Sequence, residues 1–264
     1  MIDIQNGLET RGVCIKHVGI REFVMPIVVD INGRHVHTTA TINLNVSLDA
    51  DKKAIHMSRL IEMLSEWDGN TSYTTLKELL SITKNKLQTG NANIILHFLY
   101  FKEKKAPISQ KSSIMNYKCT INMNDADDFF IIEVQVPISS ACPCSKAISK
   151  YGAHNQRGIL SIIVKTNTIA SIDDLIQKAE SSCSHELFSL LKRVDEKFIT
   201  ESTYENPKFV EDIARDMALL LSKSNGYEWF KIDVENFESI HNHSAFAVVN
   251  NSENNNGGGG QYGY

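Results

Sequence analysis

The sequence predicts an α+β protein in which a ββααββ arrangement occurs twice in tandem. Stretches rich in Val, Ile and Thr alternate with stretches whose apolar residues recur at helical spacing, in the same order in both halves. Apolar residues make up 42% of the 264 positions, which is enough to bury a sizeable core. Gly and Pro are sparse in the interior of the chain, so we expect the two modules to share a continuous sheet without a linker.

The first module, predicted at residues 12–122, opens with strands and closes with a returning strand pair. An apolar stripe from Met57 predicts one helix, and a second stripe behind the candidate N-cap Thr74 predicts another. The strands are predicted at 12–20, 24–31, 36–48, 92–102 and 114–122.

The second module, predicted at 129–249, repeats this order. One helix is predicted from Ile172 to Leu191, and the next at Asn206–Pro207, where Asn would supply the cap and Pro the first helical position. The strands are predicted at 129–137, 158–166, 227–236 and 245–249. The Asn- and Gly-rich residues 250–264 have almost nothing apolar to bury, which predicts a disordered tail.

Charge and hydropathy argue against two classes of partner. The 27 Lys and Arg residues against 31 Asp and Glu give a net charge of −4 and a pI near 6.1, which are untypical of a nucleic-acid binder. The first residues form no apolar leader, and no run of about 18 apolar residues occurs, so we expect no membrane contact and a cytoplasmic location. The five cysteines form an odd set without framework spacing, so we expect reduced thiols that are available as ligands.

Two thiols flank a proline at Cys142-Pro143-Cys144, directly after a predicted strand. A thiolate is a soft ligand for a divalent metal, although two ordinary buried cysteines would show the same pattern. Further along, His154 belongs to the polar group 153–158 at the mouth of the next strand, where a solvated loop histidine is the alternative.

Carboxylates and further imidazoles follow these thiols in the sequence. Glu196 lies in the charged group 195–197, and taken alone it is equally a surface charge. His241 and His243 have i, i+2 spacing, which puts both rings on one face of an extended segment and is a moderate metal signal. Glu211 lies in the first part of a predicted helix, where a favourable interaction with the helix dipole is the plain alternative.

In order and spacing, these motifs closely resemble those of the type IB GTP cyclohydrolases. The matching strings are CPCSK at 142–146, GAHNQRG at 152–158, DEK at 195–197, ENPKFVED at 205–212 and ESIH at 238–241. The N-terminal half agrees through VGI at 18–20 and HMSR at 56–59, so the resemblance extends from about residue 12 to residue 249.

The resemblance implies a tunnelling fold, in which two tandem ββααββ modules form an antiparallel sheet with helices on one face. It also implies a homotetramer with sites shared between subunits. The implied activity is the conversion of GTP to 7,8-dihydroneopterin triphosphate and formate, the first step of tetrahydrofolate biosynthesis, with a divalent Zn, Fe or Mn ion as cofactor.

The resemblance also carries over residue roles by motif position. Glu211 corresponds to the carboxylate that binds the guanine, and Cys144 to a second thiol near the metal. The residues that correspond to the metal environment are Cys142, which is also the candidate catalytic residue, His154, Glu196 and His241.

The chemistry of ring opening is compatible with these residue types. Hydroxide must attack C8 of guanine, and a bound metal can lower the pKa of water from 15.7 toward about 7. Glu211 would offer two acceptors to the N1–H and 2-amino donors of guanine, an edge that adenine does not present. Candidates for proton transfer are His154, His241 and His243, and candidate cations for the triphosphate are Arg59, Lys146, Arg157 and Lys197.

Two alternatives remain open at this point. Archaeal-type cyclohydrolases that form 7,8-dihydroneopterin 2′,3′-cyclic phosphate usually carry an insertion between the Cys and His motifs, and that stretch is short here. A non-catalytic purine- or pterin-binding protein of the same fold should have lost a ligand position, and all of them are present.

Overall fold

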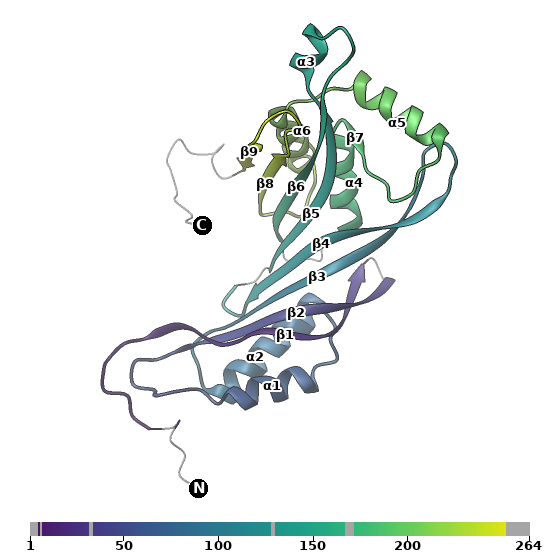
Figure 1. Cartoon of the computed structure of the whole chain (residues 1–264). Helices are drawn as coiled ribbons and strands as arrows, with labels where there is room; N and C mark the ends of the chain where they lie inside the picture. Colours follow the sequence, from purple (N-terminus) through teal and green to yellow (C-terminus); the bar gives the residue numbers. More distant parts are fainter. Residues whose placement is uncertain (1–4, 6, 32–33, 128–129, 167–171, 252–264) are drawn as a thin grey trace. The chain divides into compact units, whose positions relative to one another are not determined.

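The computed structural model describes residues 5, 7–31, 34–127, 130–166 and 172–251, shown in colour in Figure 1. The elements of these residues are, in chain order, β1 (Ile15–Ile31), β2 (Arg34–Leu48), α1 (Met57–Glu66), α2 (Tyr73–Leu87), β3 (Ala92–Lys105), β4 (Ser112–Asn124), β5 (Phe130–Ala141), α3 (Pro143–Ile148), β6 (Asn155–Thr166), α4 (Ile172–Ser182), β7 (His185–Glu186), α5 (Arg193–Glu205), α6 (Val210–Ser222), β8 (Trp229–Asn236) and β9 (Ala245–Asn250).

The strands form one nine-stranded sheet in the order β1-β2-β3-β4-β5-β6-β8-β9, with β7 paired to β5 off this path. The pairs β1–β2, β2–β3, β5–β7, β6–β8 and β8–β9 are antiparallel. The second half does not repeat the first, because α3 stands between β5 and β6, and β7 and α5 stand between α4 and α6. The predicted class, a tunnelling fold of two tandem ββααββ modules, is therefore wrong. The described residues instead form an α+β fold with one nine-stranded sheet and unequal halves.

The first strand is longer than the sequence predicts. The separate strands expected at 12–20 and 24–31 form one strand, β1, whose register against β2 shifts between Ile20 and Phe23. Gly19 lies close to the neighbouring strand, since a Cβ there would stand 2.1 Å from the carbonyl oxygen of Leu44. The glycine therefore permits the close approach of the two backbones.

The helices of the second half also differ from expectation. Helix α4 ends at Ser182 instead of continuing to Leu191, because the chain turns to pair β7 with β5. Asn206 does not cap the start of a helix, since its backbone N–H donates to Ser202 O at the end of α5. Pro207 then lacks the N–H that a continuing helix would need.

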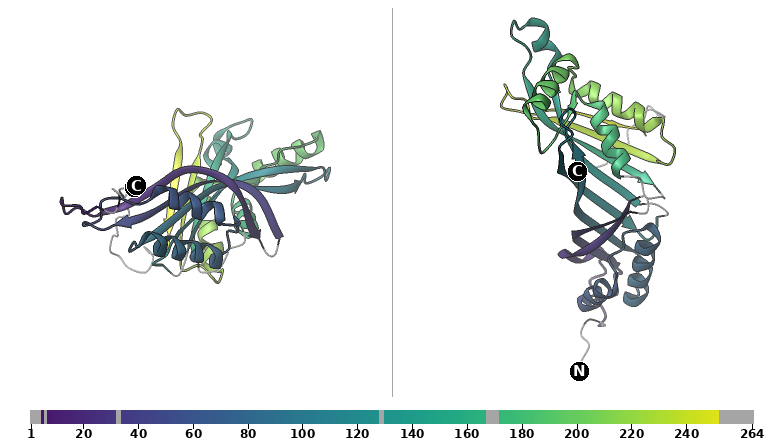
Figure 2. Two further views of the ribbon diagram at one scale, coloured as in Figure 1. Left: turned by 90° about the horizontal axis from the view of Figure 1, so that it is seen from below. Right: turned by 90° about the vertical axis from the view of Figure 1, so that its right-hand side faces the viewer.

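The described residues divide into two compact units. Strands β3, β4 and β5 each have some residues in unit 1 and the others in unit 2. Unit 1 lies within residues 1–99, 119–132 and 166–169. Its helices α1 and α2 lie side by side in Figures 1 and 2, and Ser72, not Thr74, caps α2 by accepting from Thr75 N. Their buried residues are Leu60, Met63, Leu64, Leu76, Leu79, Leu80, Thr83 and Leu87, which with alternate residues of β2 form the core of this unit.

Unit 2 lies within residues 100–118, 133–165 and 170–264. Helix α6 packs on α4, β8 and β9, and the alternating buried residues of β6 and β8 complete the core. No described helix is long and apolar enough to span a membrane.

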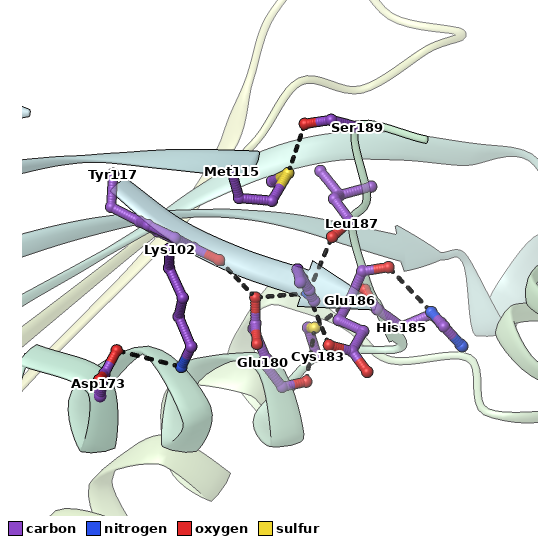
Figure 3. Close-up of polar contacts among 11 residues, drawn as sticks. Lys102, Met115, Tyr117, Asp173, Glu180, Cys183, His185, Glu186, Leu187 and Ser189 are labelled. Atoms are coloured by element: carbon purple, nitrogen blue, oxygen red, sulfur yellow. Dashed lines mark hydrogen bonds and ion pairs between the residues drawn. The ribbon is translucent and has the colours of Figure 1, made fainter. Parts of the chain in front are cut away.

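A buried polar network ties β3 and β4 to α4 and β7 in unit 2 (Figure 3). Lys104 Nζ lies 2.7 Å from Glu180 Oε1 and 2.6 Å from Glu186 Oε2, and it donates to Leu187 O. Tyr117 donates its hydroxyl to Glu180 at 3.0 Å. Burial, together with the charge of Glu180, raises the pKa of Tyr117 well above its usual range, so this hydroxyl remains a donor.

Candidate active site

Cys142 stands where β5 gives way to α3. It is the N-cap residue of α3, with Pro143 in the first turn, and its backbone N–H donates to His154 O at 3.1 Å. Ser145 adds a second link, because its hydroxyl donates to Cys142 O and accepts from His154 N, each at 3.2 Å. The first thiol and the first imidazole of the predicted set are therefore held on adjacent backbone segments. Cys142 is half-buried and Cys144 is exposed.

The ring of His154 is oriented by an amide and a carboxylate. Its Nδ1 lies 2.9 Å from Gln156 Oε1 and 3.8 Å from Glu238 Oε2, and both ionisable side chains are 14% exposed. Gln156 Nε2 donates to Ser140 Oγ, which leaves Oε1 as the acceptor for an Nδ1–H. With Nδ1 protonated, Nε2 is the ring nitrogen that can bind a metal or exchange a proton.

His241 lies in the turn that follows β8. Its backbone N–H donates to Glu238 O at 3.4 Å, and its ring stacks on that of His243 with centroids 5.0 Å apart. The two rings thus lie together, in a turn and not in the extended segment assumed from their spacing. Glu238 connects this turn to His154 through its carboxylate.

Glu196 is a predicted ligand that the fold holds apart from Cys142 and His154. It is exposed in the first turn of α5, whereas the last turn is the part that contacts α3, where Lys146 Nζ donates to Tyr204 O at 2.7 Å. Eight residues of helix place Glu196 about 12 Å along the axis from Tyr204. Within the residues that the structure describes, no group of three His, Cys, Asp or Glu side chains could hold a metal.

Glu211 is the second residue of α6 and is exposed. Lys208 N donates to Ala141 O at 3.1 Å, which brings the approach to α6 next to the residue before Cys142. Asp212, and not Glu211, caps the helix by accepting from Phe209 N. The helix start therefore has its own carboxylate, and Glu211 remains available to bind a ligand.

Three of the four candidate cations are already engaged. Lys146 holds the Tyr204 carbonyl and lies 4.5 Å from the centre of that ring. Lys197 pairs with Glu201 one helical turn away, and Arg59 donates to Lys86 O in unit 1. Arg157 is exposed at the start of β6, close in sequence to His154.

The family model for type I GTP cyclohydrolase folE2 matches residues 1–247. The chain belongs to the FolE2 family. The curated GTP cyclohydrolase FolE2 of Thermosipho africanus is 47% identical over 95% of this chain and 98% of its own length. That of Syntrophobacter fumaroxidans is 42% identical over 94% and 98%. Among solved structures, the uricase of Arthrobacter globiformis is similar, and the match covers 89% of this chain and 92% of that chain. The identity is 8% and the TM-score is 0.49, which is too low to define the fold.

Family membership confirms the resemblance predicted from the motifs, under the name FolE2. Sequence reasoning missed Gln156 and Glu238 as the partners of His154. Both stand inside the matching strings, at 152–158 and 238–241, and their polar character was the available signal. Spacing could not pair them, because contact between these segments depends on the pairing of β6 with β8.

Proposed function

We propose that the chain is a GTP cyclohydrolase that opens the imidazole ring of GTP, releases formate and forms 7,8-dihydroneopterin triphosphate, the first step of tetrahydrofolate biosynthesis. The observation that carries the proposal is the FolE2 family match over residues 1–247. The backbone hydrogen bond between Cys142 and His154 supports it, because it brings together two residues that stand inside motifs that resemble the family.

The proposal includes a divalent Zn, Fe or Mn ion bound by Cys142, His154, Glu196 and His241. Two of these donors suit such an ion by their chemistry, because a half-buried thiol and an imidazole that is protonated on Nδ1, with Nε2 left to bind, are typical zinc ligands. The proposal also includes a homotetramer in which a second copy completes each site, since Glu196 stands apart from Cys142 within one chain. When bound, the ion supplies the Lewis acidity that activates water toward C8.

The remaining steps are assigned to side chains of the chain itself. Glu211 accepts hydrogen bonds from N1–H and the 2-amino group of guanine, which sets the preference for guanine over adenine. Gln156 and Glu238 keep the proton of His154 on Nδ1. The exchange of protons with solvent during ring opening and formate release is assigned to His243, which is exposed beside His241 and is not among the proposed ligands.

The test is incubation of metal-reconstituted full-length chain with GTP, followed by mass analysis of the pteridine and an assay for formate. We expect a linear triphosphate product and one formate per GTP, with no turnover of ATP as the matched control. A 2′,3′-cyclic phosphate product would favour the archaeal-type reaction. Absence of both pteridine and formate would favour the non-catalytic binding protein.

A further inference from the structure

Residues 185–205, the flap, run from β7 through a loop to the end of α5, and little of this segment is packed. All of its residues are described, and among them only Asp195 and Thr203 are buried, both of them polar. Its apolar side chains are half-buried or exposed, with Val194 at 54% and Phe198 at 41% exposure. Segments with few buried apolar contacts are the ones that open locally at a low free energy.

The two ends of the flap are joined to each other at an anchored base. Asn206 Nδ2 donates to Cys183 O at 3.3 Å and to Ser184 O at 3.1 Å, which closes the segment into a loop. Ser184 is buried and bonded to β5, because its N–H donates to Ser139 O and its hydroxyl accepts from Ala141 N. This base is therefore a suitable hinge for the loop that it closes.

Within the flap, the β7 end and α5 pack on each other. The ring centroid of His185 lies 6.2 Å from that of Phe188 and 6.0 Å from that of Phe198, which it meets edge-on. Aromatic rings at such separations attract one another. Along α5, Lys197 pairs with Glu201. Because all these contacts lie inside the flap, they hold it together as one body when it separates from the rest of unit 2.

The β7 end of the flap is attached to β3 and β4 by polar contacts (Figure 3). Lys104 Nζ lies 2.6 Å from Glu186 Oε2 and donates to Leu187 O at 2.8 Å. Ser189 donates its hydroxyl to Ile114 O at 2.8 Å. Strand β7 adds only the pairing of its two residues with β5. These contacts form the Lys104 clasp.

The α5 end of the flap is attached to the turn between β3 and β4 through Asp195. Its Oδ1 accepts from the backbone N–H of Ile108 at 2.9 Å and of Ser109 at 2.8 Å, and its Oδ2 accepts from the Ser109 hydroxyl at 2.6 Å. Hydrogen bonds to an ionised carboxylate are stronger than those between neutral groups. The last turn of α5 adds one exposed contact, in which Lys146 Nζ donates to Tyr204 O. These contacts form the Asp195 clasp.

We propose that the flap opens and closes as one body, turning about its base at Ser184 and held shut by the Lys104 and Asp195 clasps. Both clasps are polar, and opening withdraws no buried apolar side chain of the flap from the core. Opening also removes β7 from β5, the strand that ends directly before Cys142. The inference goes beyond the proposed function, since it uses only contacts within the chain.

Hydrogen exchange of the full-length chain, followed by mass spectrometry of its peptides, tests the proposal. The amides of β7 and α5 should exchange together, and about tenfold or more faster than those of α4 and α6. Glu186→Gln weakens one clasp while Glu180 still pairs with Lys104, and Ser109→Ala removes a donor from the other. Each substitution should accelerate exchange in both β7 and α5 by about tenfold, the effect of losing a hydrogen bond to a charged group, and leave α4 and α6 unchanged.

Two further variants serve as controls. Ser109→Thr keeps the hydroxyl and should restore the slower exchange of the wild type. Glu201→Gln changes a carboxylate whose partner, Lys197, moves with the flap, so exchange in β7 should stay as in the wild type.

Three outcomes overturn the proposal, and none of them depends on GTP turnover. In the first, the amides of the wild-type flap exchange as slowly as those of α4 and α6. In the second, each substitution accelerates only the end of the flap nearest to it, because the two ends then open separately. In the third, α4 and α6 accelerate as much as the flap does, because the substitutions then act on global unfolding.

Discussion

Cys142 and Cys144 are separated by one proline, but their surroundings differ. Cys142 is half-buried and bonded through its backbone to His154, whereas Cys144 is exposed in α3. We expect Cys142→Ala to lose both bound metal and turnover, because it removes the softest ligand of the set. Cys144→Ala should retain more metal than Cys142→Ala. Elemental analysis of the purified variants and their GTP turnover check this, and equal loss of metal from both variants would show that the assignment of the two thiols is wrong.

Glu211 and Asp212 form a natural pair for comparison at the start of α6. Glu211→Gln would set an amide N–H against the N–H of guanine, at a cost of roughly 1–3 kcal/mol, so turnover of GTP should fall by about tenfold or more. Its melting temperature and metal content should stay near those of the wild type. Asp212→Asn is the control, because Asp212 caps the helix, and it should lower stability while turnover persists. Steady-state kinetics that are unchanged in Glu211→Gln would rule out the guanine contact.

Cys183 offers a test of burial through pH. Burial raises the pKa of this thiol from 9.0 to about 11, so the folded chain keeps a proton that the unfolded chain releases. The contribution of this thiol to the free energy of unfolding is fully present below pH 9.0 and is lost as the pH rises toward about 11. Over that window, urea denaturation should show the wild type losing on the order of 2–3 kcal/mol more than Cys183→Ala. Parallel pH profiles for the two proteins would show that the thiol is not desolvated as described.

The sequence predicts which residues belong to the candidate site better than it predicts which residues contact one another. The thiols, imidazoles and carboxylates of the site belong to recognisable strings, so the sequence alone identifies Cys142 and His154, whose backbones are hydrogen-bonded in the fold. The hydrogen bonds that Asp195 accepts from Ile108 and Ser109 could not be predicted, since they join residues far apart in the chain. Nothing in the spacing distinguishes this buried carboxylate from the exposed Glu196 beside it.

At the scale of whole elements, prediction succeeded where burial follows a simple period. The strand predicted at 36–48 is β2, because every second residue from Ala40 onward is buried. Helix α5 was missed for the opposite reason, since it has no apolar stripe and buries Asp195 and Thr203. The prediction of a tandem repeat is wrong as a consequence, because the first half has no helix that corresponds to α5.

The polar network around Lys104 shows how one side chain can join three elements. Lys104→Met keeps the aliphatic stem but leaves Glu180 and Glu186 facing one another without the buried cation, at a cost of about 3 kcal/mol in unfolding free energy. The control is Lys102→Met in the same strand, where the more exposed pair with Asp173 should contribute less than about 1 kcal/mol. Chemical denaturation measures both, and equal effects would mean that burial does not distinguish the two lysines.

For the molecule as a whole, the C-terminal segment provides a prediction with a defined boundary. The predicted tail begins at 250, but Asn250 belongs to β9 and Asn251 exchanges hydrogen bonds with Phe230, while 252–264 lie outside the described residues. We expect deletion of 252–264 to change neither assembly nor turnover, because its composition offers almost no apolar surface. Deletion from 250 should lower the melting temperature. Light scattering with size exclusion, a GTP assay and thermal melting test the two deletion variants. Dissociation of the protein that lacks 252–264 would contradict the prediction.

The pairing of β6 with β8 has a kinetic consequence for the site. Cys142 and His154 lie on neighbouring segments of the chain, so closing the loop between them takes little conformational entropy. Glu238 and His241 reach the same place only after β8 has paired with β6, across intervening helices and the short strand β7. Contacts so distant in sequence form late in folding. We therefore expect the backbones of Cys142 and His154 to meet early, so that a nascent chain would hold two of the proposed ligands before the carboxylate that orients His154 arrives.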